Sequence, residues 1–465
     1  MNGFLNAAVA GLMLLNMAVA AEAPDKSGKK SNLIEPTTQP SGGFKAVVPL
    51  GMILGRPASQ PDGTRNIVSY EIGQGFQLDR THCLLVASMD EQGGPDLCVG
   101  NDAFVFSKLS DIRADKAIQI NRVQVDYRMP GQDGNFYLAK YPASGFFVPL
   151  GALMDDGQPH PAAGTGLLTS VCVPFHGDRS DPTGAGKTQE EAQVENWTEM
   201  VELIPISWDG AKLTVGQARI VPEFLGRQVL DHTFSNMVAM DKGFVGIFRF
   251  ADQKHHAVRF DWDGNAWAPS KIGEPFLEAK GESEPAIARD GDRYLVSTRG
   301  RDAKGRMYAS ADGLNYQFLF DWPNTYSPRT LNKGLDGSLY LAANRNTGWF
   351  RNPLLAYPMI GNGFGEGIII HDQSGVRDDN GDKLPFVDHP LGVNLFLEGQ
   401  WRHLVFFRVC DLKERTFYGF QKDMIKKVHG DTGPIPKRLS SGLYAAEMLY
   451  DKVTTPPFAF AEEKK

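Results

Sequence analysis

Between residues 230 and 360, apolar runs alternate with short polar turns in three consecutive segments that follow one plan. Each segment opens with a serine, passes through an apolar strand and a turn containing Asp or Gly, and ends in a second strand closed by arginine. The segments run from Ser235 to Arg249, from Ser283 to Arg299 and from Ser327 to Arg345. Asp-Gly between apolar runs is a strong β-hairpin signal, because glycine adopts the positive φ of a tight turn. The pattern therefore predicts repeated antiparallel strand pairs.

A second turn recurs after the first two of these segments and, more faintly, upstream of them. Its Asp-Gly pairs end at Gly210, Gly264 and Gly313, and Trp267 and Tyr316 close the latter two copies. The spacing is near fifty residues, which is typical of a four-stranded propeller blade. We predict an all-β fold, a β-propeller of six blades, with five or seven as alternatives. A β-sandwich would not explain the recurring turn with its closing aromatic residue. Further hairpins fit around Asp133-Gly134, Gly399 and Gly442.

Composition supports this reading and limits the partners. The 465 residues include 50 Gly and 29 Pro, and both residues disrupt the interior of helices, so a helical bundle is disfavoured. Hydrophobic residues make up 42% of the chain, enough for a large core and too many for a disordered polymer. The net charge of -7 lacks the basic field of a nucleic-acid binder. We expect no nucleic-acid partner, and we expect a monomer.

The N-terminus resembles an export signal. Residues 1–20 carry no charged side chain and end in Ala18-Val19-Ala20, the small residues that a signal peptidase reads. The alternative is a membrane anchor, but the apolar run is short for one and is interrupted by Asn16. We expect a signal peptide over 1–20, a flexible linker over 21–43 and a single propeller domain over 44–465. The protein would then be secreted or periplasmic, with no membrane span after cleavage.

The chain has four cysteines: Cys83, Cys98, Cys172 and Cys410. An even number in an oxidising compartment permits disulfides, and Cys83 and Cys98 could join neighbouring strands. Pairing does not follow from the sequence, and buried free thiols remain the alternative.

The Ser-x-Asp-Gly-x-x-aromatic turns resemble shortened Asp-boxes, the hairpin motif of the sialidase (neuraminidase) superfamily, also known as the BNR repeat. The resemblance covers residues 230–360 well, about a third of the chain. It implies that the Asp of each turn accepts backbone N–H bonds and that the aromatic ring packs between blades. The motif also occurs in propellers that are not enzymes, so it indicates fold alone.

The spacing of Glu284 and Arg299, followed by the turn at Ser310, resembles the sialidase site. The resemblance implies that Glu284 polarises a nucleophilic tyrosine, because a phenol is a poor nucleophile until a carboxylate takes its proton. It also implies that Arg299 binds a substrate carboxylate through parallel N–H bonds. Arg249 and Arg345 occupy equivalent ends of neighbouring segments and complete a candidate substrate-binding set. The alternative is that these arginines brace neighbouring loops through Asp or Glu.

Tyr326 precedes a strand as the nucleophilic tyrosine of the family does, and Tyr357 is a second candidate because Arg345 follows Tyr326. The alternative for Tyr326 is packing between blades. Asp231, before His232, is an acid or base candidate by position. The general acid of the family has no clear equivalent, and Asp79 and Asp90 are further candidates for it.

Together these features predict a secreted carbohydrate-active hydrolase, a sialidase-like exo-glycosidase that acts on a carboxylated glycan with retention. One alternative is a polysaccharide lyase, in which arginine neutralises a uronate while Tyr or His removes its α-proton. Another is a glycan-binding propeller without catalysis, with Trp322, Trp349 and Phe350 stacking on sugars. We expect no cofactor. A calcium loop is a weak candidate at Asp378, Asn380 and Asp382, whose side chains alternate like calcium ligands.

Overall fold

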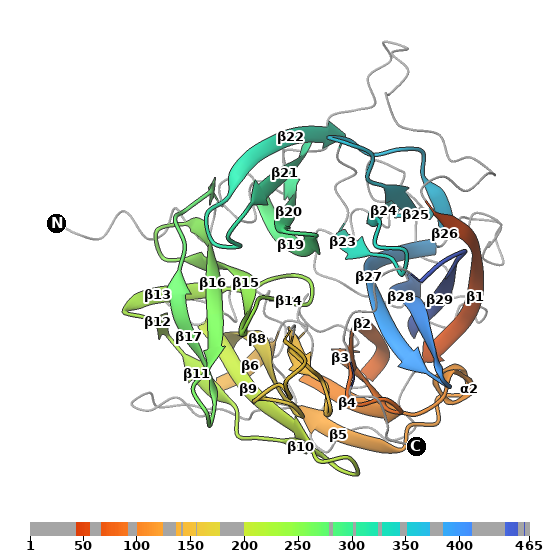
Figure 1. Cartoon of the computed structure of the whole chain (residues 1–465), viewed down its shortest axis with the longest axis horizontal. Helices are drawn as coiled ribbons and strands as arrows, with labels where there is room; N and C mark the ends of the chain where they lie inside the picture. The colour runs from red at the N-terminus through yellow and green to blue at the C-terminus, as the bar shows by residue number, and fades with distance from the viewer. Residues whose placement is uncertain are drawn as a thin grey trace.

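The computed structural model is a ring of six β-sheets (Figure 1). It describes residues 43–55, 67–91, 100–123, 136–140, 143–154, 156–176, 200–278, 282–300, 304–323, 328–344, 351–372, 385–411, 442–453 and 460. Within these ranges nearly all regular structure is strand, and each sheet forms one blade. The prediction of a six-bladed β-propeller is confirmed.

Blades 1 to 3 are formed by the first half of the chain. Blade 1 contains β2 (Ile67–Gln77), β3 (Cys83–Glu91), β4 (Gly100–Phe106) and β5 (Gln119–Val123), with the short helix α2 (Leu109–Arg113) between the last two. Blade 2 contains β6 (Phe136–Lys140), β7 (Ser144–Val148), β8 (Thr165–His176), β9 (Met200–Trp208), β10 (Leu213–Val215) and β11 (Arg219–Val221). Blade 3 contains β12 (Glu223–Phe224), β13 (Arg227–Asp231), β14 (Val238–Ala239), β15 (Gly243–Phe250), β16 (Lys254–Trp262), β17 (Trp267–Ile272) and β18 (Leu277–Glu278).

Blades 4 to 6 complete the ring. Blade 4 contains β19 (Glu282–Asp290), β20 (Arg293–Gly300), β21 (Lys304–Ser310) and β22 (Gln317–Pro323). Blade 5 contains β23 (Thr330–Lys333), β24 (Leu339–Asn344), β25 (Leu354–Pro358) and β26 (Ile368–His371). Blade 6 contains β27 (Pro385–Leu397), β28 (Gln400–Asp411), β29 (Gly442–Tyr450) and β1 (Phe44–Leu54).

The ring closes by pairing the two ends of the chain. Strand β1 is the outermost strand of blade 6 and runs antiparallel to β29, with Phe44 opposite Tyr450 and Leu54 opposite Leu443. The N-terminal strand therefore completes the C-terminal blade, which ties the first described strand to the last.

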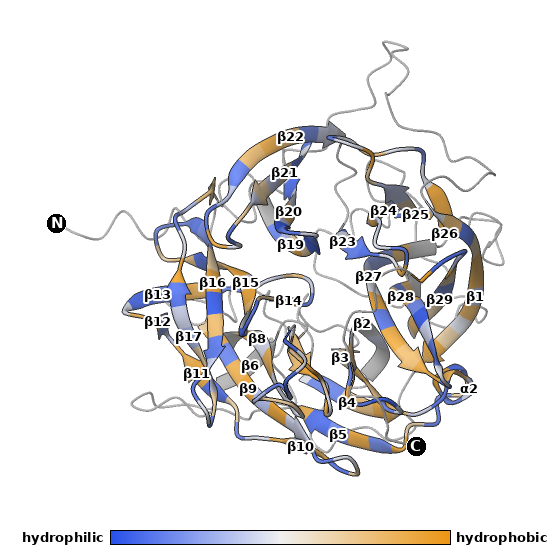
Figure 2. Ribbon diagram, in the orientation of Figure 1, coloured by the Kyte–Doolittle hydropathy of each residue, from blue (hydrophilic) through white to orange (hydrophobic). Residues whose placement is uncertain are grey.

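The core is divided into six apolar clusters, one between each pair of neighbouring blades. The cluster between blades 2 and 3, for example, joins Phe146 and Leu167 to Phe244 and Phe260. This arrangement follows from the strand pattern, because the two faces of each blade both pack on a neighbour. Figure 2 shows apolar and polar residues alternating along part of β16, the third strand of blade 3. Burial between blades supplies the main hydrophobic stabilisation of the ring.

The recurring Asp-Gly turns have the predicted geometry. Asp209, Asp263 and Asp312 each accept two backbone N–H bonds from the residues two and three positions further on. The following glycines adopt φ of 98°, 101° and 71°. The Trp267 ring lies between blades 2 and 3, where its centroid is 4.8 Å from that of Phe146. Its Nε1 donates a 3.0 Å hydrogen bond to Thr165 Oγ1.

The other predicted hairpins have different outcomes. Glu398 and Gly399 form the β27–β28 turn with φ of 53° and 80°, as predicted. The hairpin at Gly442 is wrong, since Gly442 is the first residue of β29. A Cβ there would lie 2.6 Å from the Leu54 carbonyl oxygen, so glycine permits the close approach of β1. Asp133 and Gly134 lie outside the described residues.

Two further predictions concern the cysteines and the N-terminus. Cys83 is a buried free thiol, so the predicted alternative of a disulfide from Cys83 to Cys98 is wrong. Burial raises the pKa of the Cys83 thiol to about 12. Residues 1–42 lie outside the described part, and the signal peptide and linker remain predictions. None of the helices in the described ranges is long and apolar enough to cross a membrane.

Candidate functional site

One edge of the ring carries the candidate site. At this edge the inner strand of each blade begins and the second strand ends, because the two are antiparallel. In blades 4 and 6 an arginine near the end of the second strand lies opposite a residue near the start of the inner strand. In blade 3, Arg249 near the end of β15 lies opposite Asp231, the last residue of β13. The pairs in register are Arg249 with Asp231, Arg299 with Ser283, and Arg408 with Asp388.

Glu284 and Arg299 meet directly. Arg299 Nη1 donates a 2.6 Å hydrogen bond to Glu284 Oε1, and the two side chains are 21% and 27% exposed, respectively. The second carboxylate oxygen, Oε2, is buried and has no hydrogen-bond partner among the described residues. The structure therefore brings together the two residues that the sequence singled out, and it pairs them with each other.

Glu284 has an unusual backbone conformation. Its φ is 50°, a region that residues with a Cβ rarely adopt, and the pairing of β19 with β20 shifts register between Ser283 and Ala286. Blade 3 stabilises this bulge from the side: Phe234 donates its backbone N–H to the Pro285 carbonyl at 3.0 Å, and Ser235 Oγ accepts the Ile287 N–H at 3.1 Å. Such strain persists only where the surroundings enforce it, and it is concentrated at functional sites.

Residues 232–237 form a wide bulge between β13 and β14 and reach across the ring. The side chain of Asn236 donates a 3.1 Å hydrogen bond to the Gly75 carbonyl of blade 1. The ring centroids of Phe234 in blade 3 and His389 in blade 6, the opposite blade, are 5.6 Å apart. The Ser144 hydroxyl of blade 2 donates a hydrogen bond to the Ser235 carbonyl oxygen. This bulge therefore connects the candidate residues of blades 4 and 6 near the axis.

Blade 6 contributes a buried charge cluster that the sequence analysis missed. Asp388 is completely buried, and Arg408 holds both of its oxygens, with Nε and Nη2 at 2.6 and 2.7 Å. Arg351 of blade 5 donates a further hydrogen bond to Asp388. Burial opposes ionisation of Asp388, but the charges of Arg408, His389 and Arg351 outweigh it, and its pKa lies well below the usual value. Asp388 is therefore a carboxylate at neutral pH.

A chain of contacts links blades 4, 5 and 6 through the bulge of blade 3. Burial lowers the pKa of Arg351, Asp388 opposes that shift, and the charges of Arg299 and Arg408 add to it. The chain then runs from Arg351 through Asp388 to His389, and from there through Phe234 back to the strand of Glu284. These contacts join the strand of Glu284 to the buried charge cluster of blades 5 and 6.

Blade 3 adds a more open pair. Asp231 Oδ2 lies 3.8 Å from Arg249 Nε, and the Asp231 side chain is 39% exposed while that of Arg249 is 10% exposed. The other oxygen of Asp231 accepts the His232 N–H at 2.8 Å. Beside them, burial lowers the pKa of His255 to about 4, so its ring is neutral at pH 7.

Comparison with known proteins bears on the fold. No family model and no curated relative matches the sequence. Among solved structures, the chain is similar to a sialidase of Trypanosoma rangeli, with a TM-score of 0.46 at 11% identity over 87% of this chain and 58% of that protein. It is similar to a mutant NanB sialidase of Streptococcus pneumoniae, with a TM-score of 0.48 at 10% identity over 80% and 68% of the two chains. A Dyadobacter fermentans protein of unknown function gives a TM-score of 0.51 at 11% identity over 88% and 99%.

The similarity is one of fold. Sialidases are among the solved structures that this chain resembles, but the chain spans only 58% of the length of the Trypanosoma enzyme. Since propellers support many functions, the chemistry has to be argued from the site.

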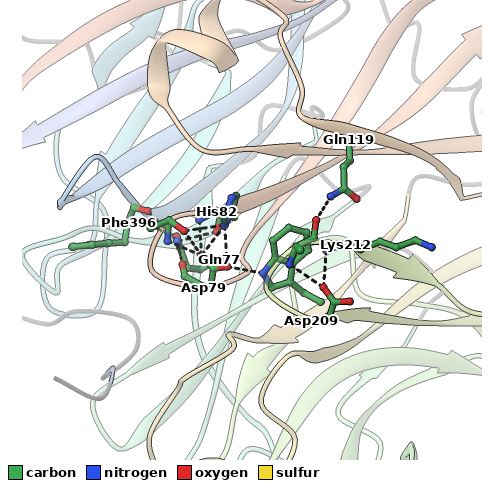
Figure 3. Close-up of polar contacts among 10 residues, drawn as sticks. Gln77, Asp79, His82, Gln119, Asp209, Lys212 and Phe396 are labelled. Carbon is green, nitrogen blue, oxygen red and sulfur yellow. Dashed lines mark hydrogen bonds and ion pairs between the residues drawn. The ribbon is translucent and has the colours of Figure 1, made fainter. Parts of the chain in front are cut away.

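Asp79 lies in the turn between β2 and β3, at the edge of the ring opposite the candidate site. It is therefore unsuited to act as the general acid of that site. Figure 3 shows its carboxylate turned toward His82. It accepts hydrogen bonds from Thr81 N, His82 N and Trp208 Nε1 at 2.6, 2.8 and 2.6 Å. Burial alone would raise the pKa of Asp79, but these hydrogen bonds lower it below the usual value. Asp79 is a turn-forming carboxylate that ties blade 1 to blade 2.

Two aromatic candidates are core residues. Tyr357 is 7% exposed and packs in the cluster between blades 4 and 5, which does not suit a nucleophile that must reach substrate. Trp322 is 9% exposed, and the Arg329 guanidinium lies 4.9 Å from its ring centroid, so its face is covered.

Most of the remaining candidates lie outside the described residues. These are Tyr326, Arg345, Trp349, Phe350 and the candidate calcium loop. Asp90 lies at the end of β3, at the same edge as Glu284. Within the described ranges, no group of three or more His, Cys, Asp or Glu side chains could hold a metal ion.

Sequence reasoning could have found blade 6 from a local signal. Ser283-Glu284-Pro285 and Asp388-His389-Pro390 both open an inner strand, and an arginine near the end of the next strand follows each. In both, the residue before proline has positive φ, 50° at Glu284 and 49° at His389, and the register shifts there.

Proposed function

We propose that the protein is a carbohydrate-active hydrolase, a sialidase-like glycosidase that cleaves a glycan bearing carboxylate groups. The observation that carries the proposal is the Glu284–Arg299 pair. Glu284 has a strained backbone, and one of its carboxylate oxygens lacks a hydrogen-bond partner among the described residues. Its partner, the Arg299 guanidinium, lies at the same edge of the ring as Arg249, Arg351 and Arg408. Guanidinium groups favour a carboxylated ligand because they keep their charge and donate parallel N–H bonds.

Arg299 is the best-placed substrate ligand of the described arginines. Its hydrogen bond to Glu284 uses Nη1, and its side chain makes no other hydrogen bond to a described residue, so the remaining guanidinium N–H groups can bind a substrate carboxylate. Arg351 and Arg408 are held by Asp388, which makes their charge part of a fixed positive background. In the proposal, Arg249 and Arg345 complete the binding set.

The proposed reaction follows a retaining mechanism. Tyr326, which enters the proposal from the sequence alone, attacks the anomeric carbon while Glu284 accepts its phenolic proton. Asp231, the more exposed carboxylate of the same edge, transfers a proton to the leaving oxygen and later removes one from water. Each proton transferred in the proposed mechanism thus has a donor and an acceptor.

The test uses sialosides and other carboxylated glycosides, with product stereochemistry followed by NMR. The wild-type protein should release the sugar with retained configuration. Glu284→Gln should reduce kcat by about 10³-fold without unfolding the protein, because the amide cannot take the phenolic proton. Full activity of Glu284→Gln would contradict the proposal, and binding of the glycan without turnover would favour a non-catalytic binding protein.

We also propose that the protein is exported. The support is the uncharged, mostly apolar stretch before Ala18-Val19-Ala20. N-terminal sequencing of protein recovered from the medium or periplasm should begin just after Ala20. Recovery of the intact N-terminus in the cytoplasmic fraction would contradict export.

A further inference from the structure

His389 occupies the same position in blade 6 that Glu284 occupies in blade 4. Each residue precedes a proline near the start of the inner strand, has positive φ and lies within a register shift. The His389 side chain is 15% exposed, and its ring faces that of Phe234 at 5.6 Å. His389 takes no part in the hydrolytic mechanism proposed above.

The surroundings of His389 are those of a proton acceptor. Its Nδ1 lies 2.8 Å from Asp388 Oδ1, a close contact that lacks ideal hydrogen-bond geometry. Asp388 is fixed by Arg408 and Arg351, so it stays ionised beside the imidazole and takes no proton from it. Burial lowers the pKa of His389, Asp388 opposes this, and Arg408 adds to it, which leaves the ring neutral at pH 7. Nε2 makes no hydrogen bond to a described residue.

The charged neighbours of His389 come from two blades. Asp388 and Arg408 belong to blade 6 and Arg351 belongs to blade 5. In blade 4, Arg299 pairs with Glu284, and its charge also acts on Arg351. A neutral base beside guanidinium groups suits the removal of a proton next to a carboxylate. The guanidinium pairs with the carboxylate and stabilises the charge that develops as the C–H bond breaks.

We propose that His389 is a general base, supported by Asp388, that gives this site β-elimination activity on a 4-O-linked uronate glycan. The inference rests on the proposed function in one respect, that the site receives a carboxylated glycan. It names the uronate as the carboxylated sugar and adds a catalytic residue that acts without Glu284.

The reaction balances without a further reactant. His389 Nε2 takes the proton from C5 of the uronate, and the C–H electron pair forms the C4–C5 double bond. The C4–O bond breaks, and its electron pair leaves with the oxygen of the neighbouring sugar, which takes a proton from water. His389 then releases its proton to solvent. The carboxylate remains bound to arginine throughout.

The experiment incubates the full chain with pectate, alginate and hyaluronan and follows two signals. Ultraviolet absorbance reports the conjugated double bond of an elimination product, while reducing ends report cleavage of any kind. His389→Gln is compared with Glu284→Gln and with His371→Gln, a matched control on β26 whose ring packs on Phe407. Circular dichroism confirms that each variant is folded, and His389→Asn provides a second variant at the site.

An unsaturated product made by the wild type, reduced at least about 100-fold in His389→Gln and retained in His371→Gln, would support the inference. Reducing ends without ultraviolet absorbance, lost in Glu284→Gln alone, would overturn the inference and leave the hydrolase proposal in place. Elimination that persists in both His389 variants would overturn it as well. Absence of cleavage on all three polymers would also overturn it, while the sialoside assay decides the hydrolase separately.

Discussion

Ser235 Oγ accepts a 3.1 Å hydrogen bond from the backbone N–H of Ile287, so a side chain of blade 3 completes the broken edge of the inner strand of blade 4. Together with the bond from Phe234 N–H to the Pro285 carbonyl, this contact supports the bulge on both sides. Glu284 lies within that bulge, and its left-handed conformation directs the carboxylate to Arg299. Blade 3 therefore determines the position of a functional group in blade 4.

Replacing Ser235 by Ala should weaken catalysis more than folding. The Ile287 N–H would lose its acceptor, at a cost of about 1–3 kcal/mol in the free energy of unfolding. Displacement of Glu284 should lower kcat by about 10–100-fold with little change in KM. Ser235→Thr keeps the hydroxyl and should recover most of kcat. Ser310→Ala, which removes a 2.8 Å hydrogen bond to Asp312 at the opposite edge, is the control. If both alanine variants lose kcat equally, Ser235 has no positioning role.

A second prediction concerns Leu225, which is strained without a function. Leu225 and Gly226 form the two-residue turn between β12 and β13 with φ of 49° and 77°, and the Leu225 side chain is 56% exposed. Asn tolerates this conformation and is preferred in such turns, so Leu225→Asn should raise the free energy of unfolding by about 1 kcal/mol. Leu225→Ala, which keeps the strain, should not. Urea denaturation measures both, and equal midpoints for the two variants would contradict the explanation.

The repeated hairpins were predictable because their information is local. An Asp that accepts the N–H groups two and three residues later, a glycine with positive φ and an apolar strand on each side all lie within a dozen residues, as at Asp312. The spacing of Glu284 and Arg299 was equally readable, since one hairpin brings the start of its first strand to the end of its second. Fold class and this pair therefore follow from short-range patterns.

The rest of the site depends on contacts between distant segments. Arg351 reaches Asp388 from another blade, and Phe234 reaches His389 across the ring. Neither contact has a local signal, because both depend on how six blades close around one axis. The pairing of β1 with β29 joins residues about 400 positions apart and was equally hidden. For His389 the sequence holds a partial signal, because Asp388-His389-Pro390 parallels Ser283-Glu284-Pro285, but the buried partners of Asp388 come from other segments.

A third prediction follows from histidines that are kept neutral by burial. Burial lowers the pKa of His255 and His371 to about 4 and that of His403 to about 3, from an ordinary value of 6.5. Between these values the unfolded chain binds protons that the folded chain does not, so stability is full above pH 6.5 and falls as the pH drops toward 4. Each histidine contributes a slope of about 1.4 kcal/mol per pH unit in that window.

Chemical denaturation at a series of pH values measures this slope. His371→Gln removes one titrating group at the least buried of the three positions, and the slope of the variant should be smaller by about 1.4 kcal/mol per pH unit. His82→Gln is a control at the opposite edge. A slope between pH 6.5 and 4 that is unchanged in His371→Gln would show that this ring is not held neutral in the folded protein.

The last prediction concerns the buried charge cluster. Asp388→Asn leaves the guanidiniums of Arg408 and Arg351 buried without their counter-charge, and should lower the free energy of unfolding by about 3–5 kcal/mol. Arg408→Met alone should cost a similar amount, because it removes the two hydrogen bonds that offset the burial of Asp388. The double variant Asp388→Asn, Arg408→Met removes both of these buried charges and should be more stable than the sum of the single effects implies.

Urea denaturation of the wild type, the two single variants and the double variant yields the coupling energy directly. Strictly additive effects would mean that Arg408 and Asp388 do not depend on each other. A coupling that differs from zero would show that the two buried charges depend on each other. Asp388 also accepts a hydrogen bond from Arg351, so the buried carboxylate joins blade 5 to blade 6 at the edge where substrate is proposed to bind. Loss of Asp388 should then loosen the same edge and raise KM for a carboxylated glycan even under conditions where the variant is fully folded.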